Sequence, residues 1–166
     1  MRTVATREEL YAKFGITAEG DQLFETELGT LLLCSQALEQ GWHVAPDGEK
    51  ARVALDEINR STLGRLLTTL KGHVRLEDGL EDRFASALKA RNRLIHGFYE
   101  RHNFEIQTGE GRDAMIDDLE GANEELFQAW RIAGAMTSLV SKIIFDAAGR
   151  TPPRTPSIES DGDVLA

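Results

Sequence analysis

The chain has 166 residues, of which 41% are hydrophobic, and a formal net charge of −9. This length and apolar content fit one globular domain with its own core. The acidic charge argues against a general nucleic-acid coat protein, which needs a basic surface. No apolar run is long enough to span a membrane, residues 1–9 lack the apolar core of a signal peptide, and the single cysteine, Cys34, excludes an internal disulfide. We therefore expect a soluble cytoplasmic protein with no membrane association.

Apolar residues recur at helical spacing through the first third of the chain. Residues 7–14 predict a short amphipathic helix that ends at Gly15. Thr17 is a candidate N-cap for a longer helix that reaches Trp42. A third helix is expected around residues 53–58.

The rest of the chain is also predicted to be helical. Ser61 predicts the start of a helix that ends at Gly72, and the next helix continues to about Asn103. Residues 104–112 are typical of a polar loop, and the longest helix is expected at 113–148. Its apolar stripe indicates a core or dimer face and consists of Leu119, Ala122, Leu126, Trp130, Ala133, Met136, Val140, Ile143 and Ala147.

These elements predict an all-α fold, an antiparallel bundle of about five helices. Residues 1–149 are expected to form one domain. Prolines and small or acidic residues then predict a disordered tail at 150–166.

The segment 84–98 places an arginine where an apolar residue belongs. At about 100° per residue, one side of this helix gathers Phe84, Ala87, Leu88, Leu94, Ile95 and Phe98. Arg91 points into the middle of that side. A guanidinium needs a charged or hydrogen-bonding partner in such a seam. We expect that partner to be an acidic side chain, a polar group of another subunit, or a phosphate.

The charge around Arg91 has the opposite sign to that of the whole chain. Residues 83–102 hold five Lys or Arg and one acid, Glu100, which gives this window a net charge of +4. A small basic island in an acidic protein suits a compact phosphate-handling site. The alternative is that the island pairs with acidic neighbouring helices.

His96 differs from the other three histidines, which are expected to be surface residues. Asn92 precedes it by one helical turn on the same polar face, within hydrogen-bonding reach. An amide in that position can fix the tautomer of the imidazole, as a catalytic histidine requires.

Arg91-Asn92, followed after three residues by His96, resembles the Arg-Asn-x-x-x-His motif of HEPN domains. The resemblance also covers the all-α class, the domain length and the long helix that follows. It implies a ribonuclease that needs no metal or cofactor and whose active site forms across a homodimer. His96 would then act as general base or acid on the ribose 2′-OH and the leaving oxygen, Arg91 would stabilise the pentavalent phosphate, and Asn92 would orient the pair.

The helix geometry is relevant to the implied dimer. Arg91 and His96 lie about 140° apart around the helix, so we expect that one helix cannot turn both toward a single point. A site at a two-fold axis would relieve this and give the arginine a partner. Four residues are candidates for contacting RNA: Lys89, Arg93 and Arg101, which can grip its phosphates, and Tyr99.

Tyr99 bears on a possible inhibitor. In HEPN toxins paired with a nucleotidyltransferase antitoxin, a tyrosine commonly stands two residues after the histidine and is modified by the antitoxin. Here Phe98 stands at that position, and Tyr99 follows it near the His96 face. An antitoxin or nucleotidyltransferase is thus a possible partner.

Three functions stay open at this point. The first is an endoribonuclease of the toxin or phage-defence kind that cuts single-stranded RNA. The second is a non-catalytic HEPN-like module for nucleotide binding, protein interaction or dimerisation. The third is an unrelated helical scaffold in which Arg91 pairs internally with an acid such as Glu39 or Asp56.

Overall fold

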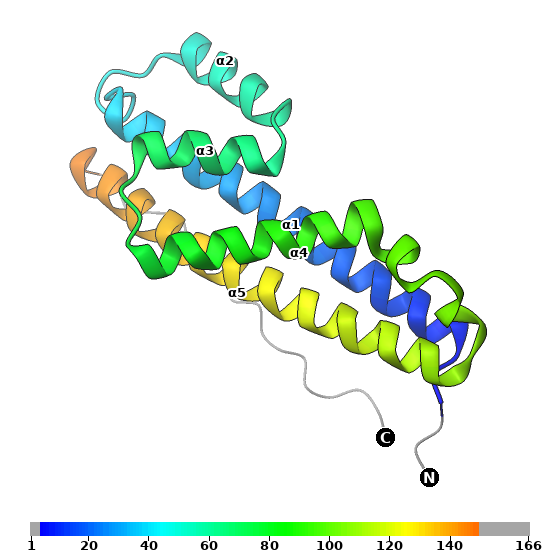
Figure 1. Ribbon diagram of the computed structural model, residues 1–166. Coiled ribbons are helices and arrows are strands. Elements are labelled where there is room, and N and C mark those ends of the chain that lie inside the picture. The colour runs from blue at the N-terminus through cyan, green and yellow to red at the C-terminus, as the bar shows by residue number, and fades with distance from the viewer. Residues whose placement is uncertain (1–3, 150–166) are drawn as a thin grey trace, which may run out of the picture.

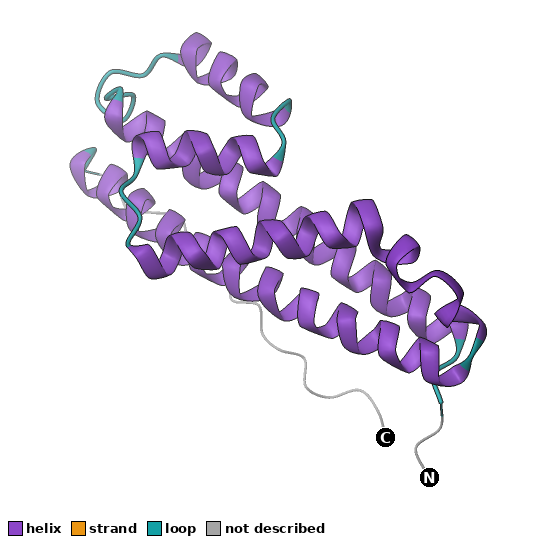
Figure 2. Ribbon diagram, in the orientation of Figure 1, coloured by secondary structure: helices purple, strands orange, loops and turns teal. Residues whose placement is uncertain are grey.

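The computed structural model describes residues 4–149, and within this range every regular element is a helix (Figure 2). The elements are α1 (Arg7–Glu39), α2 (Gly48–Asn59), α3 (Leu63–His73), α4 (Asp78–His102), the 3-10 helix η1 (Asn103–Gln107) and α5 (Gly109–Ala147). The predicted all-α bundle is therefore confirmed. The tail expected at 150–166 lies outside the described residues.

Successive α-helices run in opposite directions, so the first and the last run parallel (Figure 1). Contacts about 107 residues apart accompany α1 and α5 along their length: Ala5 N with Asp113 Oδ1 at 2.9 Å, Lys13 Nζ with Glu120 Oε1 at 3.1 Å, and Cys34 Sγ with Ser141 Oγ at 4.0 Å. Helix α4 lies across this pair in the antiparallel direction. The two longest helices thus form the base on which α4 is held.

Helix α1 begins with a capping box. The Thr6 hydroxyl accepts from Glu9 N–H at 3.1 Å, and Thr6 N–H donates to the Glu9 carboxylate at 2.7 Å. These two hydrogen bonds satisfy donors that a helix start otherwise leaves free.

The prediction that Gly15 separates two helices is wrong, because α1 is continuous from Arg7 to Glu39. Gly15 lies on the exposed face, where a glycine costs only about 1 kcal/mol. Buried Leu10 and Phe24, on either side, hold the helix against the core. Thr17 is not a cap: its hydroxyl donates to the Lys13 carbonyl at 2.9 Å within the helix.

Two other boundaries differ from the predictions. The N-cap of α3 is Thr62, which accepts from Arg65 N–H, whereas Ser61 donates back to the Glu57 carbonyl. The expected loop at 104–112 is instead η1 and the first turn of α5.

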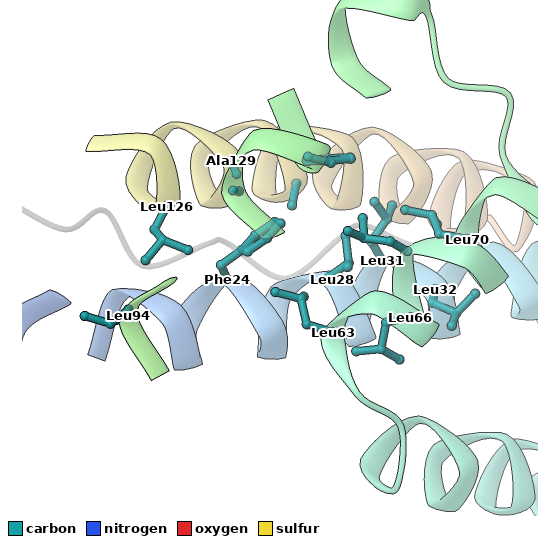
Figure 3. Packing of buried hydrophobic residues seen from close by; sticks show 14 of the residues in the cluster. Phe24, Leu28, Leu31, Leu32, Leu63, Leu66, Leu70, Leu94, Leu126 and Ala129 are labelled. Atoms are coloured by element: carbon teal, nitrogen blue, oxygen red, sulfur yellow. The ribbon is translucent and has the colours of Figure 1, made fainter. Parts of the chain in front are cut away.

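The core lies between α1, α3, α4 and α5 (Figure 3). The Phe24 and Phe84 rings, from α1 and α4, pack with centroids 5.8 Å apart. On α5 the predicted stripe is buried at Leu119, Ala122, Leu126 and Ala133. Further along, Ile143 is 52% exposed, so the stripe leaves the core toward the end of α5.

Helix α4 buries most of the face expected of it. Phe84, Ala87, Leu94 and Phe98 are buried. Ile95 is 44% exposed, so its predicted place on the buried side is wrong. Ala90, at the opposite edge of the apolar face, is buried instead. Within residues 4–149 no helix is both long and apolar enough to cross a membrane.

Candidate functional site

Helix α4 brings the three predicted site residues together. The Arg91 side chain is 20% exposed, and Asn92 and His96 lie on the exposed face of the helix. Arg91 Nη1 lies 3.2 Å from Asn92 Oδ1 and 3.5 Å from His96 Nε2. We call these three residues the α4 cluster.

The expectation that one helix cannot turn Arg91 and His96 toward one point is wrong. The 140° separation holds for the backbone, but the arginine stem is long enough to carry its guanidinium across to the imidazole. A second subunit is therefore not needed to bring the two groups together.

Asn92 has a different partner from the one expected. Its side-chain oxygen accepts from Arg91 Nη1, so the amide orients the guanidinium and not the imidazole. Arg91 Nη1 also lies 3.5 Å from His96 Nε2. Because a guanidinium can only donate, a hydrogen bond here requires the tautomer in which Nε2 carries no proton, which is the form that a general base uses.

The internal partner of Arg91 is Asp21, a residue that the sequence analysis did not single out. Asp21 Oδ2 lies 3.6 Å from Arg91 Nε, and the Asp21 side chain is only 5% exposed. The acids proposed for this role are engaged elsewhere, Glu39 with His73 and Asp56 with Arg52.

A sequence signal for Asp21 does exist. It stands four residues after Thr17 and three before Phe24, both of which are fully buried. An acid at that helical register faces the core and needs a cation, just as Arg91 needs an anion.

Burial dominates the electrostatics of Asp21 and raises the pKa of this carboxyl. Arg91 opposes the shift by charge attraction, Glu25 adds to it by repulsion, and the pKa stays above its ordinary value. Neither Asp21 Oδ1 nor Arg91 Nε has a hydrogen-bond partner among the described residues. The ion pair thus consists of the single 3.6 Å contact between Asp21 Oδ2 and Arg91 Nε. Arg91 Nη1 is not used by Asp21 and lies beside His96 instead.

The other residues predicted to contact RNA lie in different surroundings. Lys89 and Arg93 are exposed and form no ion pair within residues 4–149. Arg101, in contrast, is paired with Asp118 of α5. Tyr99 is 42% exposed, whereas Phe98 is buried.

A second group of titratable side chains joins α4, η1 and α5. The His102 side chain is only 12% exposed, which corrects the expectation of a surface histidine, and its Nδ1 contacts the Glu105 carboxylate. His102 Nε2 lies 2.8 Å from Asp118 Oδ2. Burial on its own would raise the pKa of Asp118, but hydrogen bonds and charge from His102 and Arg101 outweigh it and lower the pKa. This group fastens the end of α4 to α5.

Three cavities lie elsewhere on the molecule. One of about 380 Å³ opens between α1, α2 and α3, and two others, of about 540 and 380 Å³, flank the α1–α2 connection. The α4 cluster lines none of these three, so it is an open surface site.

Comparisons of the chain with protein families, with curated proteins and with solved structures found no match. What the site can do follows from its own groups, which are an exposed imidazole, a guanidinium beside it, and a buried carboxyl group behind the guanidinium. Together these can bind an anion and move a proton.

Proposed function

We propose that this protein is a metal-independent endoribonuclease of the toxin or phage-defence kind, acting through Arg91, Asn92 and His96. The observation that carries the proposal is the 3.5 Å approach of Arg91 Nη1 to His96 Nε2 on an exposed helix face. The resemblance of these residues to the HEPN motif, within an all-α bundle, adds support.

The chemistry assigns one task to each residue. His96 Nε2 takes the proton of a ribose 2′-OH, and O2′ then attacks the adjacent phosphorus. The P–O5′ bond breaks, and the proton passes from the imidazolium to O5′. The products are a 2′,3′-cyclic phosphate and a 5′-hydroxyl end, so atoms and charge balance without a co-reactant.

The guanidinium of Arg91 stabilises the charge that develops on the non-bridging oxygens of the pentavalent phosphate. Asn92 orients that guanidinium from within α4, and Asp21 restrains it from α1. An arginine positioned before the substrate arrives loses little entropy on binding it, which favours the transition state.

The proposed active form is a homodimer in which two α4 clusters face one cleft. Ile95, exposed beside the cluster, is an apolar side chain that such an interface would cover. An antitoxin or nucleotidyltransferase that covers the same face would silence the enzyme.

A second candidate is a non-catalytic module, the unrelated helical scaffold in which Arg91 pairs internally with an acid. The Arg91–Asp21 ion pair favours it, because an internal carboxylate already satisfies the arginine without a phosphate. This is the relationship that a helical scaffold requires, although it uses Asp21 and not Glu39 or Asp56.

Incubating the purified protein with single-stranded RNA and EDTA separates the two candidates. The nuclease proposal expects fragments with 2′,3′-cyclic phosphate ends and a loss of about 10²- to 10⁴-fold in rate for His96→Ala. His73→Ala, a histidine paired with Glu39 away from α4, is the matched control and should cut normally. Intact RNA at every dose of wild-type protein would favour the non-catalytic module.

A further inference from the structure

Two exposed tyrosines lie on neighbouring helices beside the α4 cluster. Tyr99 of α4 is 42% exposed and Tyr11 of α1 is 51% exposed. Phe14, one helical turn after Tyr11, packs against Tyr99 with ring centroids 5.3 Å apart. Aromatic side chains with so large an exposed fraction, next to a polar site, indicate a binding surface.

The position of Tyr99 relates it directly to the cluster. Asn92, Ile95, His96 and Tyr99 follow the i, i+3, i+4, i+7 pattern, so they form one stripe along α4. Tyr99 lies about 4.5 Å beyond His96 along the helix axis. A group bound at His96 therefore has Tyr99 as its next neighbour on the stripe.

The Tyr99 ring is also held in place. Besides Phe14, it contacts the buried Phe98 ring edge-on, with centroids 5.2 Å apart and an interplanar angle of 80°. Two aromatic contacts restrict the rotamers of Tyr99, so a flat partner can stack on it at little further entropic cost.

The charges on α4 indicate what kind of flat partner it is. Lys89 and Arg93 are exposed cations that have no acidic partner in the described part of the chain, and Arg91 directs Nη1 to the same stripe. A ligand complementary to this surface needs phosphates to pair with the cations and an unpaired base to stack on the Tyr99 ring. Single-stranded nucleic acid has both, whereas a duplex keeps its bases stacked within the helix.

We infer that Tyr99, supported by Phe14 and flanked by Tyr11, is a nucleobase-stacking subsite for the nucleotide next to the scissile phosphate. This inference rests on the proposed function and deepens it, because it assigns one residue to base contact and so gives a physical reason for the expected preference for single-stranded RNA. Stacking tolerates any base, so the subsite favours single strands without reading their sequence.

The test measures binding apart from cleavage. In a His96→Ala background, fluorescence anisotropy with a labelled 12-nucleotide single strand gives the affinity of each variant. Tyr99→Ala should weaken binding about 5- to 100-fold, and Tyr99→Phe should keep it, because both rings stack. Phe127→Ala removes an aromatic side chain of nearly the same exposure, 43%, from α5 and should leave the affinity unchanged. A duplex of the same sequence should bind more weakly than the single strand.

Each outcome separates this inference from the proposed function. If wild-type protein cuts RNA but Tyr99→Ala binds and cuts as wild type does, the stacking subsite is wrong and the nuclease stands. If nothing is cut but single strands bind through Tyr99, the subsite stands and the nuclease is wrong. Equal losses for Tyr99→Phe and Tyr99→Ala, together with a change in sedimentation, would overturn the subsite and assign Tyr99 to contact between copies of the chain.

Discussion

Asp21 of α1 and Arg91 of α4 form an ion pair across the helix interface, with Asp21 Oδ2 3.6 Å from Arg91 Nε. The same guanidinium turns Nη1 outward to His96. One arginine thus connects a buried carboxylate to an exposed imidazole. This arrangement explains how an arginine can occupy the seam of an amphipathic helix and still face solvent.

Asp21→Asn separates the positioning role of Asp21 from its effect on stability. Asn has the same side-chain shape as Asp but lacks the charge that burial disfavours, so the free energy of unfolding should change by only about 1 kcal/mol. Arg91 loses its restraint, and RNA cleavage should fall roughly 10- to 100-fold. Denaturant unfolding and single-turnover cleavage measure the two effects. Full activity in a folded Asp21→Asn protein would show that Asp21 does not position Arg91.

Because the pKa of Asp21 is raised, the difference in stability between wild type and Asp21→Asn should depend on pH. A carboxyl whose pKa is higher in the folded state makes folding less favourable as pH rises through the window above 3.8. Wild type should therefore lose stability relative to Asp21→Asn between acidic and neutral pH. Urea unfolding of both proteins across that range checks the sign, and the opposite slope would contradict the burial of an ionised Asp21.

Asp118 should behave in the opposite way. Its pKa is lowered in the folded state, so its stabilisation is complete above its unfolded value of 3.8 and is lost as pH falls through the folded value. Asp118→Asn should cost about 1–3 kcal/mol at neutral pH, because His102 and Arg101 lose a charged acceptor. The difference from wild type should shrink toward zero in strong acid. A penalty independent of pH would assign Asp118 a packing role instead.

Two glycines of α5 provide a matched test of whether the 3-10 helix η1 packs against α5. A Cβ on Gly111 would lie 2.1 Å from the Glu105 carbonyl oxygen, so Gly111→Ala should destabilise the fold by about 1–3 kcal/mol. Gly121 has nothing within 4 Å of such a Cβ, and Gly121→Ala should stabilise α5 by roughly 0.5–1 kcal/mol. Thermal unfolding compares them, and equal effects would mean that η1 does not pack on α5.

The sequence patterns predicted the helices well because apolar spacing reports burial directly. They failed where tertiary contacts outweighed a local signal. Gly15 and Thr17 resembled a helix break, yet Leu10 and Phe24 on either side hold α1 in one piece. Residues 104–112 resembled a loop because the close approach of Gly111 to the backbone of Glu105 is visible only in three dimensions.

The candidate site was predictable in part. Arg91, Asn92 and His96 follow from a short motif on one helix, where spacing fixes proximity. Asp21 is 70 positions away from Arg91, and no rule of spacing joins them. The 140° between Arg91 and His96 described the backbone correctly but not the reach of a flexible side chain.

The central claim is that Arg91 and His96 act together on one phosphate. Single-turnover cleavage of single-stranded RNA in EDTA by wild type, Arg91→Ala, His96→Ala and the double variant tests it most directly. Groups that act as a unit lose their effect together, so each single variant should fall about 10²- to 10⁴-fold and the double variant no further than the worse single one. Losses that multiply in the double variant, or single variants that cut as wild type does, would contradict the account.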